Sequence, residues 1–241
     1  MIRIAAVGDI HLGEKSRGAF RPAFEELPNC ADVLLLAGDL TRHGTAAEAK
    51  VLADEVADLG VPVIAVLGNH DWHSDAADQV TGALYDVGVQ VLEGTGTVLE
   101  IDGCRLGVAG TKGFCCGFPG RQASEFGEPE MRAFVAHARN LAEAFGDALL
   151  QLECDIRVGL THYSPVKDTL AGEPPEIHAF LGDYHLAEAL DNAQADLAVH
   201  GHAHAGSPRG LTAGGVRVRN VAHPVIGTAF SVFELPHPDV L

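Results

Sequence analysis

The stretch IRIAAVGDIH, residues 2–11, opens with a short apolar run and continues with a glycine, an aspartate and a histidine. Short runs rich in Val, Ile and Leu are typical of buried strands. Apolar runs that also end in a polar or glycine-containing turn recur at residues 33–37, 61–67, 106–109, 156–160 and 197–199. The sequence therefore predicts a set of buried strands, each followed directly by a turn.

Helical patterns lie between several of these runs. Apolar residues recur at helical spacing in residues 46–59 and 131–152, and residues 74–87 and 183–193 are shorter candidates. Strands that alternate with helices imply crossover connections and a layered α/β fold.

Other segments alternate in polarity without a helical pattern between them: residues 90–92, 97–101, 216–221 and 229–235. This alternation predicts antiparallel hairpins, so we expect a mixed sheet or two stacked sheets. Residues 110–129 are rich in Gly, with Phe and Pro, and predict a long loop. Long ordered loops are often functional.

The composition is that of one large domain covering residues 1–241. Apolar residues make up 47% of the chain, enough to bury a large core. With 16 basic residues against 33 acidic ones, the net charge is −17, which argues against a nucleic-acid backbone as the main partner. A small anionic substrate fits all the same, because a bound metal reverses the local field.

The five cysteines form no CxxC pair, and their number is odd. A disulfide framework is therefore not expected, and a reducing cytoplasm fits best. The first ten residues lack the pattern of a signal peptide, and no apolar run approaches the roughly 20 residues that a membrane helix needs. These features predict a cytoplasmic protein without a membrane partner.

Potential metal ligands or proton-transfer groups come directly after five of the expected strands. They are Asp9 and His11, Asp39, the run Asn69, His70 and Asp71, then His162, and finally His200, His202 and His204. In open α/β sheets, ligands bind at the carboxyl ends of the strands. Five distant turns can therefore converge on one crevice.

These residue types suit a pair of divalent ions. Two such ions about 3.5–4 Å apart repel each other, and a shared carboxylate holds them together. The mixture of imidazole and oxygen ligands admits Mn, Fe, Zn, Co or Ni, with Mn or Fe favoured. Taken singly, the motifs are ambiguous: Asp39 could cap a helix, and Asn69 could favour a left-handed turn.

The ordered set of motifs resembles the calcineurin-like metallophosphoesterases, and the resemblance spans residues 9–204. It rests on Asp9-x-His11, Gly38-Asp39, Gly68-Asn69-His70-Asp71, His162 and Gly201-His202-x-His204. Residues 110–114 and 161–165 further resemble the bacterial Icc-related subgroup. The resemblance implies a layered α/β/β/α sandwich of mixed β-sheets flanked by helices, with the active site at the carboxyl ends of the strands.

The resemblance also implies a role for each motif residue. One metal ion would be bound by Asp9, His11, Asp39 and His204, and the other by Asp39, Asn69, His162 and His202. His70 would face the phosphate, donating to its oxygen or protonating the leaving alkoxide. Asp71 would orient His70 or its loop.

The implied activity is hydrolysis of a phosphomonoester or phosphodiester by in-line attack of a hydroxide that bridges the two ions. A small phosphorylated substrate is expected, with nucleotides and cyclic nucleotides among the candidates. The substrate specificity of the enzyme would depend on loops near Arg42, His43, Phe114 and Tyr163. The alternatives are a metal-binding scaffold without activity and a nuclease, which the acidic balance and the lack of an aromatic and basic track disfavour.

The remaining histidines and cysteines carry no motif. His200 would point away from the crevice and pack inside, because adjacent strand residues face opposite ways. We also expect surface positions for His137, His178, His185 and His237, and free thiols near the pocket for Cys115 and Cys116.

Overall fold

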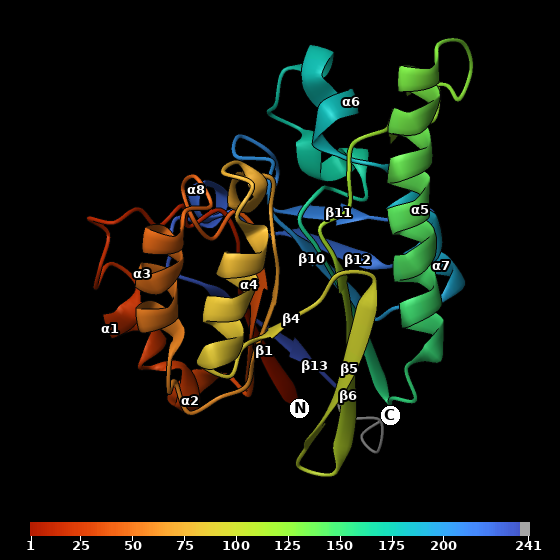
Figure 1. The fold of residues 1–241 in the computed structure, drawn as a ribbon. Coiled ribbons are helices and arrows are strands. Elements are labelled where there is room, and N and C mark those ends of the chain that lie inside the picture. Colours follow the sequence, from red (N-terminus) through yellow and green to blue (C-terminus); the bar gives the residue numbers. More distant parts are fainter. Residues whose placement is uncertain (237–241) are drawn as a thin grey trace.

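The computed structural model describes residues 1–236, so the predicted surface residue His237 lies outside the described residues. Two large β-sheets stack face to face, and helices cover the outer face of each sheet (Figure 1). The predicted α/β/β/α sandwich is therefore confirmed.

The first sheet has five strands in the order β13-β1-β2-β3-β4. Their bounds are Ser231–Leu235 for β13, Ile2–Val7 for β1, Val33–Ala37 for β2, Val63–Val66 for β3 and Gln90–Val91 for β4. Strands β1 to β4 pair in parallel, and β13 pairs antiparallel with β1 at the edge.

The second sheet has six strands in the order β11-β12-β10-β9-β6-β5. Their bounds are Arg209–Leu211 for β11, Arg217–Asn220 for β12, Leu197–His200 for β10, Ile156–Thr161 for β9, Cys104–Thr111 for β6 and Thr95–Ile101 for β5. The central strands β12, β10, β9 and β6 pair in parallel, and β11 and β5 are antiparallel edges.

The helices divide between the two outer faces. Beside the first sheet lie α1 (Arg21–Phe24), α2 (Leu27–Cys30), α3 (Ala46–Val56) and α4 (Ala77–Asp86), and beside the second lie α5 (Pro129–Gln151) and α7 (Tyr184–Asn192) (Figure 1). The short helices α6 (His178–Leu181) and α8 (His223–Ile226) complete the set, with 3-10 turns at His70–Trp72, Lys167–Leu170 and Pro175–Ile177.

Strand β1 explains why the strands read as continuous apolar runs. Ala5 and Val7 pack with the helices on the outer face, whereas Ile4 and Ala6 pack against the second sheet. A strand that is buried on both faces needs apolar residues at every position. The core therefore has three layers. Because both faces of each central strand are buried, polar side chains of a functional site have room only where the strands end.

The hairpin predictions hold in part. Residues 97–101 do lie in an antiparallel hairpin, formed by β5 and β6, and β12 forms one with β11. The prediction for residues 90–92 is wrong, because β4 pairs in parallel with β3 after the intervening helix α4. An antiparallel pair needs only a tight turn, whereas a helix between strands makes a parallel crossover.

The predicted loop at residues 110–129 is shorter and more structured than expected. Strand β6 continues to Thr111, and the small hairpin of β7 (Gly117–Phe118) and β8 (Arg121–Gln122) lies within the loop. Helix α5 already begins at Pro129.

Arg157 on β9 joins the second sheet to the ends of both covering helices. Its guanidinium donates to the carbonyl oxygens of Leu149 at 2.9 Å, Leu152 at 3.0 Å and Ala193 at 2.9 Å. We expect Arg157→Ala to lower the free energy of unfolding by about 2–3 kcal/mol, because three carbonyl groups lose a charged donor. Urea unfolding measures this change.

The matched control is Arg139→Ala on α5, whose guanidinium pairs with Glu125 at the surface. An exposed ion pair contributes little to stability, so its urea midpoint should stay close to that of the wild type. Equal midpoints for the two variants would contradict the role given to Arg157.

Candidate metal centre

The carboxyl ends of five parallel strands meet at one edge of the sandwich, between the two sheets. Strands β1, β2 and β3 end in the turns that carry Asp9, Asp39 and Asn69, and β9 and β10 lead to His162 and His202. The turns touch each other directly: the backbone N–H of Asp9 donates to the Gly38 carbonyl at 2.8 Å. The expected convergence of the five turns is therefore found.

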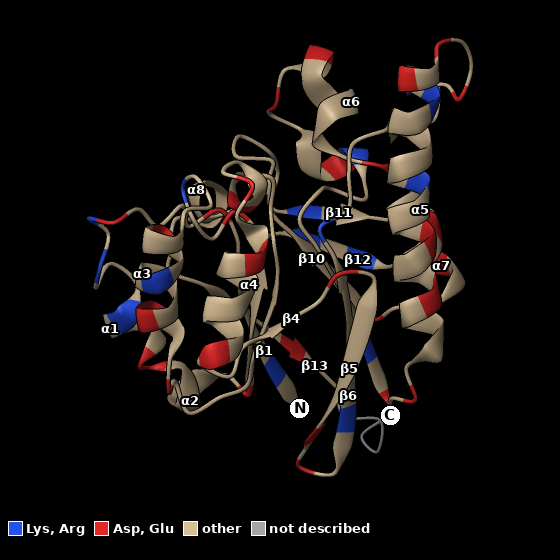
Figure 2. Ribbon diagram, in the orientation of Figure 1, with Lys and Arg blue, Asp and Glu red and all other residues tan. Residues whose placement is uncertain are grey.

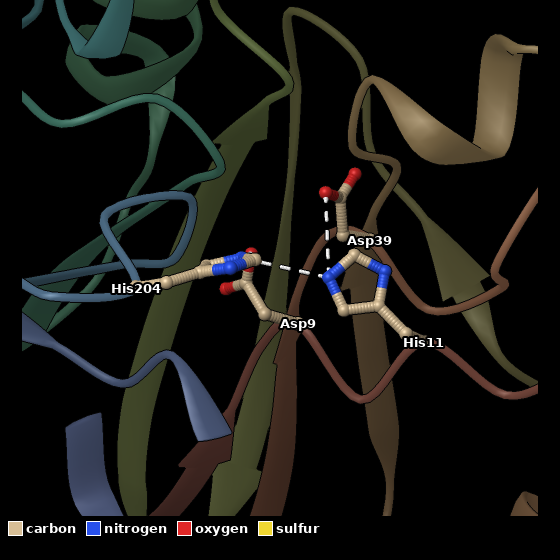
Figure 3. Close-up of side chains that lie close together, drawn as sticks. All are labelled: Asp9, His11, Asp39 and His204. Atoms are coloured by element: carbon tan, nitrogen blue, oxygen red, sulfur yellow. Dashed lines mark hydrogen bonds and ion pairs between the residues drawn. The ribbon is translucent and has the colours of Figure 1, made fainter. Parts of the chain in front are cut away.

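A first group of side chains consists of Asp9, His11, Asp39 and His204, whose potential ligand atoms all lie within 4.8 Å of one another. His204 Nε2 lies 2.9 Å from Asp9 Oδ1 and 3.5 Å from His11 Nε2. His11 Nε2 in turn lies 3.9 Å from Asp39 Oδ2. Figure 3 shows these four side chains pointing toward one another.

A second group shares Asp39 with the first. Potential ligand atoms of Asp39, His162 and His202 again lie within 4.8 Å of one another. His162 Nε2 is 3.3 Å from Asp39 Oδ1, 3.1 Å from His202 Nδ1 and 3.0 Å from Asn69 Oδ1. The Asp39 carboxylate thus lies between two clusters of nitrogen and oxygen atoms.

Backbone carbonyls fix the tautomers of the two buried rings. His162 Nδ1–H donates to the Ala37 carbonyl at 2.9 Å, and His202 Nε2–H donates to the Phe180 carbonyl at 3.3 Å. The facing nitrogens, His162 Nε2 and His202 Nδ1, then both carry lone pairs. Two lone pairs directed at one another repel, and a cation between them satisfies both. The donor set therefore fits a metal ion.

Burial favours the neutral form of three of the histidine rings, whereas the hydrogen bond to Asp9 raises the pKa of His204. Burial lowers the pKa of His11 to about 4 and that of His202 to about 3, and it holds the pKa of His162 well below its usual value. Burial, with the charge of Asp39, raises the pKa of Asp9 to about 6 against the opposing hydrogen bond from His204. Neutral imidazoles and buried carboxylates together favour a bound cation.

The backbone is bent unusually at four of the candidate ligands. Left-handed φ angles occur at Asp9 (56°), His11 (43°), Asp39 (51°) and His202 (69°). Each non-glycine residue in this region costs on the order of 1 kcal/mol, and such positions cluster at functional sites. The bends turn these side chains from the strand ends into the shared space.

Glycines before the ligands let the turns approach one another. A Cβ atom on Gly38 would lie 2.5 Å from His162 Nδ1, and one on Gly68 would lie 2.1 Å from Asp39 Oδ1. A Cβ atom on Gly201 would lie 2.2 Å from Asp9 Oδ2. The glycines of these motifs are therefore a packing requirement of the site.

Asp71 bonds to the loop rather than to the His70 ring. Its buried carboxylate accepts hydrogen bonds from the backbone N–H groups of Gly68 at 2.8 Å and Thr41 at 2.8 Å, and from the Thr41 hydroxyl at 2.6 Å. Of the two roles expected for Asp71, these bonds correspond to holding the loop. Burial and the charge of Asp39 raise its pKa to about 6.

His70 presents an accessible ring beside the shared carboxylate. Its Nδ1–H donates to the Arg42 carbonyl at 2.7 Å, and its Nε2 lies 3.9 Å from Asp39 Oδ2. Its side chain is 43% exposed, against 2% for that of Asp39. A molecule that enters the site can therefore meet His70 Nε2 directly.

The four expected substrate-binding residues have different environments. Arg42 is exposed beside His70, but the ring of His43 is 3.1 Å from Glu48 Oε1 at the start of α3. Tyr163 is buried with its ring 4.3 Å from that of His202, and Phe114 packs between Tyr163 and α5. Their substrate contacts stay a prediction.

The remaining histidines differ from the expectations in two cases. His200 is buried and hydrogen-bonded to Thr169, as predicted, and His137 is exposed. His178 and His185 are half-buried rather than surface residues, because each ring bonds to a neighbouring backbone or carboxylate oxygen.

This arrangement of two sheets, with acidic and imidazole side chains gathered at the strand ends, is that of a metal-dependent phosphoesterase. The chain belongs to the calcineurin-like phosphoesterase family, whose sequence profile matches residues 2–206. Family membership and the predicted enzyme class are thereby confirmed, while the likeness to the Icc-related subgroup stays a prediction.

Individual relatives agree with this placement. A curated protein of Synechococcus sp. named as a probable cyclic nucleotide phosphodiesterase is 38% identical over 80 residues, covering 29% of this chain and 31% of that protein. The match thus spans about a third of the relative's length.

Solved structures share the fold. The phosphopantetheinyl hydrolase PptH of Mycobacterium tuberculosis has 18% identity and a TM-score of 0.68, with 98% of this chain and 96% of that chain covered. The protein TT1561 of Thermus thermophilus has 18% identity and a TM-score of 0.57, with coverages of 91% and 88%. Among the described residues, no helix has the length and apolar character needed to cross a membrane.

The close approach at Gly201 gives a direct test of the site. We expect Gly201→Ala to weaken Mn²⁺ binding by at least roughly tenfold, because the added methyl group would displace the Asp9 carboxylate. Titration calorimetry with Mn²⁺ measures the affinity. Gly82→Ala in α4 is the control, since no atom lies within 4 Å of its added Cβ. Unchanged affinity in Gly201→Ala would contradict the geometry.

Proposed function

We propose that this chain hydrolyses small phosphoesters at a centre of two divalent metal ions. The observation that carries the proposal is the single carboxylate of Asp39, which lies between two sets of nitrogen and oxygen atoms that each fit one ion. A shared carboxylate is what two ions about 3.5–4 Å apart require.

The ligands of the two ions follow from these groups. Asp9, His11, Asp39 and His204 would bind one ion, and Asp39, Asn69, His162 and His202 would bind the other. The set contains no thiolate, so it suits Mn, Fe, Zn, Co or Ni, with Mn or Fe favoured by the carboxylates.

The charge balance of the site favours a phosphate group. Two ionised carboxylates, Asp9 and Asp39, offset only half of the charge of two divalent ions. When bound, the ions supply an activated water for in-line attack and positive charge that stabilises the phosphoryl oxygens. The chain itself contributes the fixed orientation of the ligands through the carbonyls of Ala37 and Phe180.

His70 is positioned to act as a proton donor. With Nδ1–H held by the Arg42 carbonyl, its other nitrogen faces the site. In the protonated ring, Nε2–H can donate to a phosphate oxygen or to the leaving alkoxide. A scaffold that only holds metal ions has no use for such a group, which favours an enzyme.

A small substrate is favoured over a nucleic acid. In the described part of the chain, Lys and Arg are scattered and form no continuous track along the strand ends (Figure 2). The relatives are named for cyclic nucleotides and phosphopantetheinyl groups, both small phosphorylated compounds. A nucleotide or cyclic nucleotide is therefore the substrate class proposed here. No disulfide occurs in the described residues, which supports a cytoplasmic location.

The shared carboxylate makes the sharpest test of the two-metal proposal. We expect Asp39→Asn to lower the Mn²⁺-dependent hydrolysis of bis(p-nitrophenyl) phosphate by more than roughly a hundredfold, with fewer than two ions bound per chain. Metal analysis after gel filtration measures the bound ions. Full activity with two ions in this variant would rule the proposal out.

His70 should affect turnover without affecting metal content. We expect His70→Gln to keep the wild-type metal stoichiometry and to lower kcat by roughly 10²–10⁴-fold, the usual contribution of a positioned acid or base. His137→Gln, which changes an exposed ring on α5, should leave kcat unchanged. Two bound ions without turnover of any ester in the wild type would favour the scaffold.

A further inference from the structure

A second cluster of metal-ligating side chains lies apart from Asp39 and its partners. It consists of Cys116, Asp183 and His185, whose potential ligand atoms all lie within 4.8 Å of one another. Cys116 directly precedes β7, Asp183 is the N-cap of α7, and His185 lies in the first turn of α7. The cluster shares no residue with the proposed dinuclear centre.

One oxygen of this cluster lacks a partner. The side chain of Asp183 is fully buried, and its Oδ1 accepts bonds from the His185 backbone at 3.0 Å and from the His185 ring at 2.7 Å. Its Oδ2 is the single buried side-chain polar atom of the described residues that makes no hydrogen bond. A buried acceptor left without a partner costs about 1–3 kcal/mol, and more when it is charged.

We propose that Cys116, Asp183 and His185 form a third metal site that binds a borderline-soft divalent ion of the zinc type. Sulfur, imidazole nitrogen and carboxylate oxygen are the three kinds of ligand that zinc takes in proteins. The ion would give the unpartnered oxygen of Asp183 its missing contact. The His185 side chain is 22% exposed, so solvent reaches one of the three proposed ligands.

The geometry needs little adjustment. Ligand atoms bound to one tetrahedral zinc ion are separated by roughly 3–4 Å, given metal–ligand distances of about 2.0–2.3 Å. Atoms that already lie within 4.8 Å of one another are close to this spacing. On binding, the Cys116 thiol releases its proton to solvent and its thiolate bonds to the ion.

The electrostatics of this cluster favour a bound cation. Burial, with a contribution from Asp183, raises the pKa of the Cys116 thiol to about 11. Burial also raises the pKa of Asp183. In their ionised forms the Cys116 thiolate and the Asp183 carboxylate repel each other. A divalent cation bound to both offsets this repulsion.

A metal ion at this site would also stabilise a segment that contacts the dinuclear centre. The Gly182 carbonyl accepts bonds from the backbone N–H groups of Cys116 at 3.1 Å and Gly117 at 2.9 Å. Two residues before Gly182, the Phe180 carbonyl accepts the bond from the His202 ring. An ion at Cys116 and Asp183 would therefore stabilise the segment that orients His202.

Cobalt provides a probe that distinguishes the two kinds of site. A Co²⁺ ion bound to a thiolate shows a sulfur-to-metal charge-transfer absorption in the near ultraviolet, and the proposed dinuclear centre has no sulfur ligand. Co²⁺ is titrated into the full, reduced, metal-free chain. We expect this absorption to reach the intensity of one thiolate-bound cobalt ion per chain when all sites are filled, and to be lost on adding excess Zn²⁺.

Matched variants locate the site. Cys116→Ser should abolish the absorption, whereas Cys115→Ser, which changes the neighbouring buried thiol, should keep it. His185→Ala alters a partly exposed ring and should weaken cobalt binding at this site by at least roughly tenfold even if Cys116→Ser folds poorly.

Asp39→Asn separates this proposal from the proposed function. The variant should retain the thiolate absorption although the dinuclear centre fails. The third site is overturned if the wild type shows no such absorption, if Cys116→Ser and Cys115→Ser reduce it equally, or if His185→Ala binds cobalt as tightly as the wild type.

Discussion

The buried carboxylate of Asp39 is the contact on which the arrangement of both sheets at the site depends. It accepts the backbone N–H of His70 at 2.8 Å from the turn after β3, and it lies 3.3 Å from His162 Nε2 after β9. Burial, with the charge of Asp39, raises the pKa of both Asp9 and Asp71 to about 6. Three aspartates buried so close together destabilise one another unless a cation is present. A bound metal ion would offset this repulsion.

The positions of the candidate ligands could be predicted from sequence because they follow a local rule. Each strand buried on both faces is an apolar run, and the first polar residue after it marks the carboxyl end. The run before Asp9 and the run before Asp39 therefore gave both the strands and the edge where they end. The glycines before Asp39 and His202 can also be read in the sequence, although their physical reason is a close approach to His162 and Asp9, which are distant along the chain.

Features that depend on partners distant in sequence could not be predicted in this way. The parallel pairing of β4 depends on its neighbour β3, and a two-residue strand carries no pattern that reveals this. The choice between the two roles expected for Asp71 depends on the backbone N–H of Thr41, which lies 30 residues earlier and which no side-chain motif records. Similarly, Cys116 forms no CxxC pair, and its neighbours Asp183 and His185 come from the start of a helix much later in the chain.

The two clusters also differ in a way that assigns them different tasks. The centre around Asp39 contains only nitrogen and oxygen ligands, and four left-handed residues hold its side chains toward an accessible His70. Strained backbone of this kind is typical of sites that must be preorganised for chemistry. The Cys116 cluster lies at the N-terminus of α7 and just before β7, with two of its three proposed ligands buried. A thiolate ligand and enclosed surroundings favour tight binding over turnover. This physical contrast favours catalysis at the strand ends and a supporting role beside α7, where an ion would act on His202 through the backbone.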